Sequence, residues 1–186
     1  TIKIVKGDLL EEPNAIYVAF TDSFGVGPSD HISPTSLQGK YLESIWHGDE
    51  LALREAVENG LLCSHGPTLT HEVGCVSLVT APNGKRAYCV AQSHMNSTNK
   101  AKATTFNLVR ALENFYAAVN QKENHGVISI PIIGQGLSRV SGITPGMAIE
   151  LIALTAFTQT AEEKFTSEIR IVAQPEQYRE LNLREI

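Results

Sequence analysis

The stretch ISIPIIGQGLSRVSG, residues 128–142, decides how the rest of this chain is interpreted. Its first half has the apolar pattern of a buried strand, and its second half is a loop with two glycines. Thr144 and Pro145 then begin a helix, because threonine is a good N-cap and proline is tolerated in the first helical turn. A glycine-containing loop between a buried strand and a helix is a common way to present backbone N–H groups to a phosphate. The stretch therefore predicts an α/β fold with a phosphate-binding loop.

The loop combines backbone and side-chain groups that suit an anion. Gly134 and Gly136 lack a Cβ, so the backbone can approach a phosphate closely, while Ser138 and Arg139 supply a hydroxyl group and a cation. A tight turn that carries a surface arginine is the alternative, and the spacing leaves both open. Arg139 stands where a dinucleotide fingerprint needs its third glycine, which disfavours a Rossmann oxidoreductase. The candidate residues of the loop are Gly134, Gln135, Gly136, Leu137, Ser138 and Arg139.

Strand and helix patterns alternate on both sides of this stretch. Strands are predicted at residues 2–6, 15–20, 74–80, 86–91, 127–133 and 169–173, and helices at 36–44, 49–59, 100–120, 145–158 and 175–181. The first two strands are expected to be adjacent, and Asn83-Gly84 predicts a hairpin between the third and the fourth. This order predicts a three-layer α/β/α fold with a mixed central sheet.

Two helices carry specific expectations about burial. In the helix at 100–120, apolar residues recur at three- and four-residue spacing and predict its buried face. That face consists of Phe106, Val109, Leu112, Tyr116 and Val119. The helix at 145–158 is apolar nearly all round and is therefore expected to lie deep in the protein.

Composition excludes several classes of function. The 186 residues, of which 42% are hydrophobic, suit one domain with a full core. A formal net charge of −5 without a basic run argues against a nucleic-acid-binding surface. The three cysteines show no C-x-x-C spacing and the six histidines no ligand spacing, so neither a disulfide framework, a zinc site nor another metal site is expected. The chain has no bilayer-spanning apolar run, and its start at Thr1 leads us to expect a cytoplasmic piece of a longer, membrane-anchored protein.

Two further loops are expected to lie at the same edge of the sheet as the phosphate loop. Asp8 directly follows the first strand and could accept hydrogen bonds from a ligand amine, or it could simply form a turn. The long polar segment at residues 21–35 follows the second strand, and loops of that length are usually functional. It could close over the phosphates, or its polar residues could be ordinary turn formers. The candidate ligand-binding residues of these loops are Asp8, Leu9, Thr21, Asp22, Ser23, Phe24, Gly25, Gly27 and Ser36.

Together these features resemble a macrodomain, the family of ADP-ribose-binding α/β/α folds. KGDLL at residues 6–10 is similar to the Gly-Asp-Ile-Thr turn of that family, and IIGQGL at 132–137 is similar to its second phosphate-binding loop. The resemblance implies that Asp8 receives the adenine amino group and that the glycine loops hold the diphosphate. It implies a small nucleotide ligand, ADP-ribose or a derivative, and no cofactor.

Two departures from the family pattern bear on catalysis and on adenine binding. Family members with hydrolase activity usually carry Val-Asn-Ala-Ala-Asn after the second strand, whereas residues 17–21 here are YVAFT. Without the asparagine that positions the reactive ribose, we expect no catalytic residue and no enzyme. The alternative is an ADP-ribosyl hydrolase in which Asp22 or His31 activates water. Where many relatives stack adenine on an aromatic ring, this chain has Ala173 and Gln174.

The segment ISPTSLQG at residues 32–39 makes the chain most similar to the macrodomain of bacterial Thoeris antiphage effectors. This resemblance implies a sensor of an NAD-derived signal, such as histidine-ADP-ribose, produced by a partner TIR-domain enzyme. It places the domain next to membrane helices, and self-association of the full-length protein is compatible with that role. In this hypothesis Thr21, Asp22 or the loop at residues 31–36 contacts the distal ribose and the group attached to it.

Overall fold

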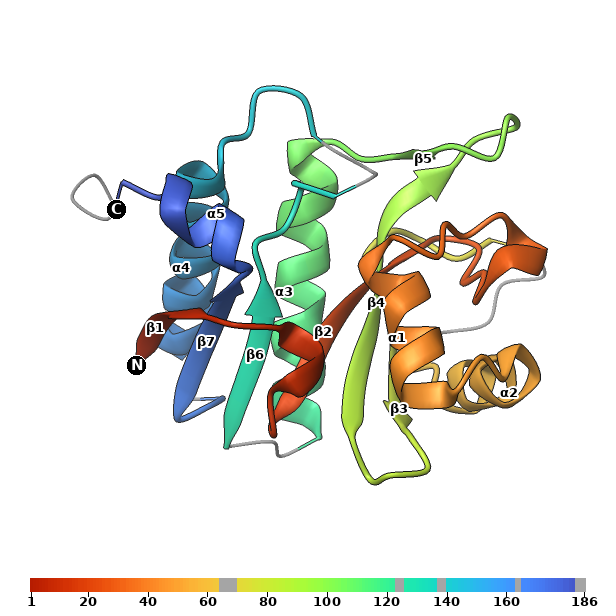
Figure 1. The fold of residues 1–186 in the computed structure, drawn as a ribbon. Helices are drawn as coiled ribbons and strands as arrows, with labels where there is room; N and C mark the ends of the chain where they lie inside the picture. Colours follow the sequence, from red (N-terminus) through yellow and green to blue (C-terminus); the bar gives the residue numbers. More distant parts are fainter. Residues whose placement is uncertain (64–69, 123–125, 137–139, 163–164, 183–186) are drawn as a thin grey trace.

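The computed structural model describes residues 1–63, 70–122, 126–136, 140–162 and 165–182. Strands and helices alternate along the chain, as Figure 1 shows. In chain order they are β1 (Ile2–Lys6), the 3-10 helix η1 (Leu9–Glu11), β2 (Ala15–Thr21), the 3-10 helix η2 (Pro28–Asp30), α1 (Leu37–Trp46), α2 (Glu50–Asn59), β3 (Val76–Thr80), β4 (Arg86–Met95), β5 (Ala101–Lys102), α3 (Thr105–Gln121), β6 (Val127–Pro131), α4 (Pro145–Glu162), β7 (Glu168–Ala173) and α5 (Pro175–Glu180).

The strands form one mixed sheet in the order β1-β7-β6-β2-β4-β3, and β5 pairs with the end of β4. β1, β7, β6, β2 and β4 run parallel, whereas β3 and β5 are antiparallel to β4. The predicted hairpin between β3 and β4 is therefore confirmed. The expectation that the first two strands are adjacent is wrong, because β7 and β6 lie between them. β1 and β2 are joined through η1, and Leu9 of η1 is buried among the side chains that face α1 and α2. The connection therefore passes over that face of the sheet instead of turning back as a hairpin.

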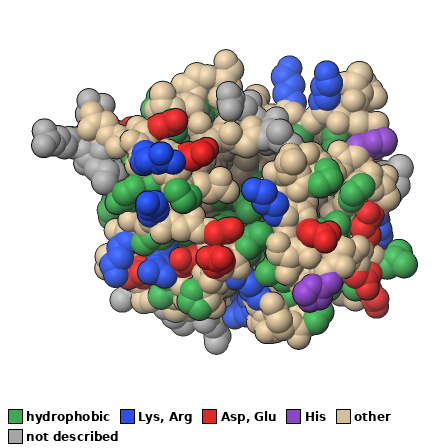
Figure 2. Space-filling model, in the orientation of Figure 1, with side chains coloured by type: hydrophobic (Ala, Val, Ile, Leu, Met, Phe, Trp, Pro, Cys, Tyr) green, Lys and Arg blue, Asp and Glu red, His purple; other side chains and the backbone are tan. Residues whose placement is uncertain are grey.

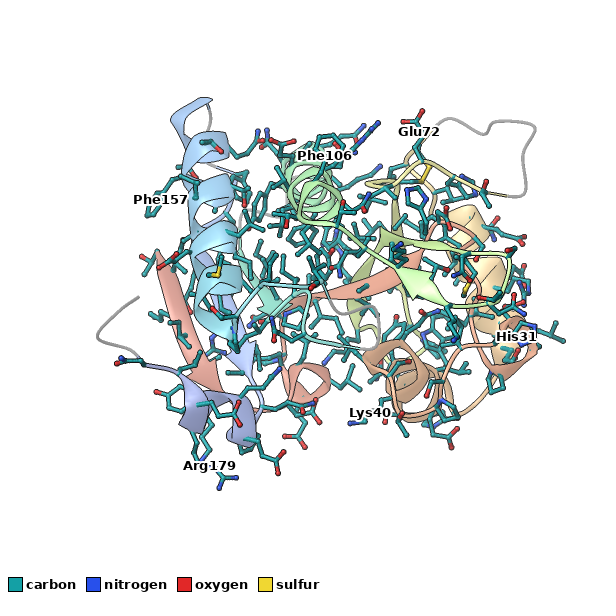
Figure 3. All side chains as sticks on the ribbon, turned by 90° about the horizontal axis from the view of Figure 1, so that it is seen from above. His31, Lys40, Glu72, Phe106, Phe157 and Arg179 are labelled. Atoms are coloured by element: carbon teal, nitrogen blue, oxygen red, sulfur yellow. A yellow bond between two sulfur atoms is a disulfide. The ribbon has the colours of Figure 1, made fainter. Side chains whose placement is uncertain are left out.

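Helices cover both faces of the sheet, which confirms the three-layer α/β/α architecture. β2 shows how one strand serves both layers, because neighbouring side chains of a strand point to opposite faces. Ile16, Val18 and Phe20 pack with α1 and α2, whereas Tyr17 packs with α3 and α4. Figure 3 looks along the edge of the sheet and shows α3 and α4 on one side and α1 on the other.

Two expectations about helix burial are corrected. Phe106 belongs to the predicted buried face of α3, but 69% of it is exposed, and Phe115 occupies the core instead. α4 does not lie deep, because Met147, Leu154 and Phe157 are 50%, 62% and 67% exposed. Figure 3 shows Phe157 pointing outward from α4, on the side away from α3. The physical reason is that one layer of helices covers this face, so the outer side of α4 has no element of the described chain over it.

Capping side chains set where the helices begin. Ser36, Asp49 and Thr144 each accept a hydrogen bond from a backbone N–H three residues ahead, as their residue types predict. The helix predicted from residue 100 begins only at Thr105. Thr104 and Asn107 form a reciprocal capping box there, and β5 occupies residues 101–102.

The cysteines also differ from expectation. Cys63 and Cys75 form a disulfide, with their Cα atoms 5.5 Å apart, although the sequence indicated no disulfide framework. Tertiary structure brings them together, since the Leu62 N–H donates to the Val76 carbonyl at 2.9 Å. Cys89 is a buried free cysteine, and burial raises the pKa of its thiol. None of the helices in the described part of the chain is long and apolar enough to cross a bilayer.

Candidate functional site

A cavity of about 730 Å³ lies at the edge of the sheet where the parallel strands end. Its lining includes the ends of β1, β2, β4, β6 and β7 and the start of α1. Carboxyl ends of parallel strands are the usual ligand site of an open α/β sheet. The predicted site residues that line the cavity are Asp8, Leu9, Thr21, Ser36, Gly134, Gln135 and Gly136.

The cavity exists because two central strands diverge. β2 pairs with β6 only through Ala15↔Ile128 and Ile16↔Ser129, whereas its pairing with β4 continues to Thr21. Beyond the second pair, the carboxyl halves of β2 and β6 are no longer hydrogen-bonded to each other. Both of these halves line the cavity, so the cavity lies where the strand order changes direction, between neighbouring parallel strands, which is the usual place for a ligand.

The Gly7-Asp8 turn places a carboxylate at one end of the cavity. The Gly7 N–H donates to the Ala173 carbonyl at 3.0 Å, which ties the turn to the end of β7. Asp8 Oδ1 accepts the Leu10 N–H at 2.9 Å, so the aspartate is a turn former and the N-cap of η1. Asp8 is exposed, and its second carboxylate oxygen accepts no hydrogen bond from the described residues. That oxygen can therefore receive a ligand amine.

The start of the phosphate loop is held in a conformation that requires glycine. Gly134 has a φ of +72°, and a Cβ there would lie 3.0 Å from Leu108 Cδ1 in α3. The Gly134 carbonyl accepts the Val140 N–H at 3.1 Å, and Gln135 Nε2 donates to the Ile143 carbonyl at 2.9 Å. A Cβ on Gly136 would face open space, so packing does not require glycine at that position. Leu137, Ser138 and Arg139 lie outside the described residues, and their role in binding stays a prediction.

The first turn of α1 forms another wall of the cavity. Ser36 Oγ accepts the Gly39 N–H at 2.9 Å and donates to the Ser33 carbonyl at 2.7 Å. A Cβ on Gly39 would lie 2.3 Å from that same carbonyl, so the loop that contains Ser33 packs directly on the helix. The positive end of the helix dipole therefore points to the cavity. Leu37, Gln38 and Lys40 line it as well.

The segment after β2 does not serve the cavity as expected. The side chain of Asp22 turns away from it, because its carboxylate accepts the Met95 N–H at 2.9 Å and lies 2.8 Å from His94 Nδ1. Phe24 packs against Phe20 and His71. The structure thus leaves five predicted residues outside the cavity lining, because this segment packs against the end of β4, His71, η2 and α2. They are Asp22, Ser23, Phe24, Gly25 and Gly27.

Sequence reasoning missed two cations of the cavity, Lys40 and Lys100. Lys40 belongs to α1 and Lys100 precedes β5, so no local motif connects them. Among the described residues that line the cavity, Asp8 is the only one with a carboxylate, so two positive charges face one negative charge. The net charge of the cavity lining therefore favours an anionic ligand, although the formal net charge of the chain is −5. Figure 2 shows acidic and basic side chains mixed over one face of the molecule, without a broad basic surface.

Gln92 is a further missed residue, and a buried partner fixes its orientation. The Tyr17 hydroxyl donates to Gln92 Oε1 at 2.9 Å. Burial raises the pKa of Tyr17, so the hydroxyl keeps the proton that it donates. Gln92 is left with its amide N–H groups as donors for the cavity. The remaining polar residues that reasoning from sequence missed are Gln38, Ser93, Asn99, Gln174 and Gln177.

The family of the chain follows from a comparison with family models. The model described as "Thoeris protein ThsA, Macro domain" matches residues 2–174. The chain belongs to the ThsA macrodomain family. This confirms the resemblance inferred from the Gly-Asp turn, the second glycine loop and the segment at residues 32–39. A search among curated proteins found no match.

Solved macrodomains share the fold of this ThsA macrodomain at low sequence identity. The Trypanosoma brucei macrodomain in complex with ADP-ribose is 12% identical with a TM-score of 0.65, covering 96% of this chain and 66% of that one. The Oceanobacillus iheyensis macrodomain with MES bound is 16% identical with a TM-score of 0.59, covering 95% and 85%. The macro domain of ganglioside induced differentiation associated protein 2 is 16% identical with a TM-score of 0.56, covering 97% and 81%. These likenesses show the fold.

Proposed function

We propose that this macrodomain is a binding module for an ADP-ribose-containing nucleotide. The observation that carries the proposal is one cavity that joins the Asp8 turn, the loop at Gly134 and the first turn of α1. These parts offer an acceptor for an amine and two groups of backbone donors for phosphates. A volume of about 730 Å³ is within the range of sites that enclose small organic ligands.

Asp8 is the group that binds the adenine end. Its outer carboxylate oxygen accepts the exocyclic amine, while the inner oxygen remains bonded to the Leu10 N–H. Gln174 and Gln177 line the same end of the cavity, at the start of α5. They provide amide groups for the ring nitrogens, where other macrodomains are expected to place an aromatic ring.

The diphosphate lies between the Gly134 loop and the first turn of α1. Backbone N–H groups at a helix N-terminus and at a glycine loop favour anions, and Lys40 and Lys100 add positive charge. The distal ribose and its substituent then face Thr21, His31 and the loop that contains Ser33.

Because the chain is a ThsA macrodomain, we propose that the ligand is an NAD-derived signal such as histidine-ADP-ribose. A TIR-domain enzyme makes this signal, and the macrodomain passes the binding event to a membrane effector in antiphage defence.

Binding without turnover is the function that we favour. Asp22, one candidate base for hydrolysis, is committed to His94 and the Met95 N–H and does not line the cavity. His31 does line the cavity, which keeps an ADP-ribosyl hydrolase as the second candidate. Incubation with ADP-ribosylated protein distinguishes the two. Tight ligand binding with ADP-ribose release at the background rate supports the sensor, whereas release that is lost in His31→Ala supports the hydrolase.

Calorimetry with ADP-ribose and with histidine-ADP-ribose tests the proposal directly. We expect saturable binding of at least one of them, and Asp8→Ala should weaken it at least about tenfold, because a hydrogen bond to a charged group is lost. Asp49→Ala is the matched control, since Asp49 also caps a helix but does not line the cavity. Absence of both heat and thermal shift with either nucleotide at millimolar concentration would refute the proposed function.

Lys100 should contribute through charge. Lys100→Gln is expected to weaken nucleotide binding by up to about fivefold, because an exposed ion pair contributes about 1 kcal/mol at most. The loss should shrink as salt is added, since salt screens exposed charges. Lys102→Gln removes the same charge two residues away, from a side chain outside the cavity lining. Equal losses in the two variants would show that Lys100 has no specific contact with the ligand.

A further inference from the structure

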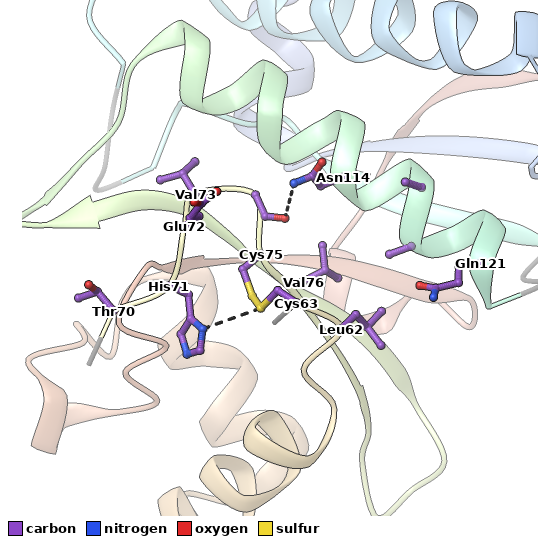
Figure 4. A pocket seen from close by; sticks show the side chains of 13 residues that line it. Leu62, Cys63, Thr70, His71, Glu72, Val73, Cys75, Val76, Asn114 and Gln121 are labelled. Carbon is purple, nitrogen blue, oxygen red and sulfur yellow. Dashed lines mark hydrogen bonds between the residues drawn. A yellow bond between two sulfur atoms is a disulfide. The ribbon is translucent and has the colours of Figure 1, made fainter. Parts of the chain in front are cut away.

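A second cavity, of about 830 Å³, lies between α3 and the segment that leads into β3, and three side chains that commonly bind metals line it. Cys63, His71 and Cys75 all line it, and their ligand atoms lie within 4.8 Å of one another. Figure 4 shows the imidazole of His71 directed at the sulfur pair. We propose that these three residues, with the cysteines reduced, bind one zinc ion. This proposal is independent of the nucleotide-binding function.

The distances fit a tetrahedral zinc site once the sulfur atoms separate. Zn–S bonds of about 2.3 Å and Zn–N bonds of about 2.0 Å place S and N about 3.5 Å apart, and two S atoms about 3.8 Å apart. Cys63 Sγ is already 3.8 Å from His71 Nδ1. The Cα atoms of Cys63 and Cys75 are 5.5 Å apart, so rotation of the side chains can open the sulfur pair around an ion.

Backbone hydrogen bonds hold His71 and Cys75 independently of the disulfide, and the Leu62 N–H bond to the Val76 carbonyl holds the residue next to Cys63. The His71 N–H donates to the Asp22 carbonyl at 2.8 Å, and the ring of His71 packs edge-on against Phe24. The Cys75 N–H donates to the Glu72 carbonyl at 3.0 Å, and the Cys75 carbonyl accepts the Ala91 N–H at 2.9 Å. Reduction therefore leaves the ligands in place, and a preorganised site loses little entropy when the metal binds.

Gly74 fixes the short turn between His71 and Cys75. Its φ is +93°, and a Cβ there would lie 2.5 Å from Asn114 Nδ2. The Gly74 N–H donates to the Ala91 carbonyl at 2.7 Å, and its own carbonyl accepts Asn114 Nδ2 at 3.0 Å, as Figure 4 shows. The turn is thus tied to both β4 and α3, and this brings a histidine and a cysteine four positions apart to the same point.

The donor set selects the metal, and the described residues supply three of the four ligands of a tetrahedral site. Two thiolates and an imidazole suit zinc, whereas magnesium and calcium prefer oxygen ligands. Glu72 does not complete the set, because its carboxylate pairs with Arg110 at 2.5 Å. The described residues offer no fourth metal ligand in this cluster, so water or an added ligand can complete it. Three protein ligands with an open position are the arrangement found in zinc sites that bind exogenous groups.

The disulfide and the zinc site are two states of the same cluster. Reduction by a dithiol adds two electrons and two protons to the Cys63–Cys75 bond, and the dithiol becomes a disulfide. Zinc binding then displaces the two thiol protons and forms two Zn–S bonds. Oxidation of the cysteines removes both thiolates, so the oxidised protein should not bind the metal.

Cobalt binding to the whole chain tests the site, because tetrahedral cobalt thiolates absorb strongly. The protein is reduced with a phosphine, and Co²⁺ and then Zn²⁺ are added. We expect a thiolate-to-cobalt charge-transfer band that saturates at one equivalent and disappears when zinc displaces cobalt. The oxidised protein should show no band. A reduced protein that takes up no cobalt, or that re-forms its disulfide in the presence of reductant and zinc, overturns the proposal.

Variants assign the ligands. His71→Ala and Cys63→Ser should each weaken zinc binding by more than about tenfold, since even the loss of an outer partner of a zinc ligand costs tenfold or more. Cys89→Ala and His47→Asn are the matched controls, because Cys89 is buried elsewhere and asparagine tolerates the φ of 54° at His47. Unchanged cobalt spectra in His71→Ala would contradict the site, whether or not the cysteine variant folds.

Discussion

Phe115→Ala is expected to lower the free energy of unfolding by about 3–5 kcal/mol, the cost of emptying a buried aromatic position. Phe115 is fully buried between α3 and the sheet. Its ring packs edge-on against Tyr17 and Tyr88, with centroids 5.1 and 5.3 Å away, and tilted against Tyr116 at 5.3 Å. Three aromatic neighbours cannot collapse into the space without losing these contacts. Urea denaturation followed by tryptophan fluorescence or circular dichroism measures the change.

Phe106→Ala is the control for this prediction. It makes the same substitution on the same helix, but Phe106 is 69% exposed, so a change within about 0.5 kcal/mol is expected. The pair also tests the corrected burial pattern of α3. Equal destabilisation by the two variants would mean that Phe106 is packed against something and that the orientation of α3 is different.

Gly134→Val is expected to remove nucleotide binding while most of the fold persists. A β-branched residue at a φ of +72° costs about 1–3 kcal/mol, and its Cβ would press on Leu108. The loop can relieve this strain only by moving away from the position in which its N–H groups face the cavity. Losing two charge-assisted hydrogen bonds of about 1.5 kcal/mol each corresponds to a loss of affinity of about 100-fold. Calorimetry with ADP-ribose measures the affinity, and a urea titration measures the stability.

Gly84→Val separates the strain from the function. Gly84 has a φ of +82°, and a Cβ there meets nothing within 4 Å, so valine introduces similar backbone strain in the β3–β4 turn. That turn does not line the cavity. The two variants should therefore lose comparable stability, but only Gly134→Val should lose affinity. Normal nucleotide binding by Gly134→Val would show that the Gly134 loop does not hold the phosphate.

Local pattern was sufficient for the parts of the fold that depend on neighbouring residues. The cap at Thr144 and the hairpin at Asn83-Gly84 follow from short-range chemistry, and the structure confirms them. Helix faces were harder to predict. Phe106 fits one apolar period of α3, but the buried side of that helix is the one that carries Leu108, Leu112 and Phe115. α4 is apolar on a side that the described chain leaves uncovered.

The site was partly predictable for the same reason. Asp8 and Gly134 lie two and three residues after a strand end, where position in sequence determines position at the edge of the sheet. Asp22 also follows a strand end, yet hydrogen bonds to the end of β4 turn its carboxylate away from the cavity. No pattern indicated this, because the partners are more than seventy positions away in the chain.

By itself, the sequence determined the alternation of strands and helices, the glycine loop after β6 and the membership of the macrodomain family, since local hydrogen bonding and short motifs encode these features. Only the tertiary structure decided which strands are neighbours. The insertion of β7 and β6 between β1 and β2, and the early parting of β2 from β6, create the cavity. The same long-range packing places Lys40 and Lys100 in the lining of one cavity and brings Cys63 to Cys75. Contacts of this kind depend on how the layers fit together, and no short segment of the chain contains that information.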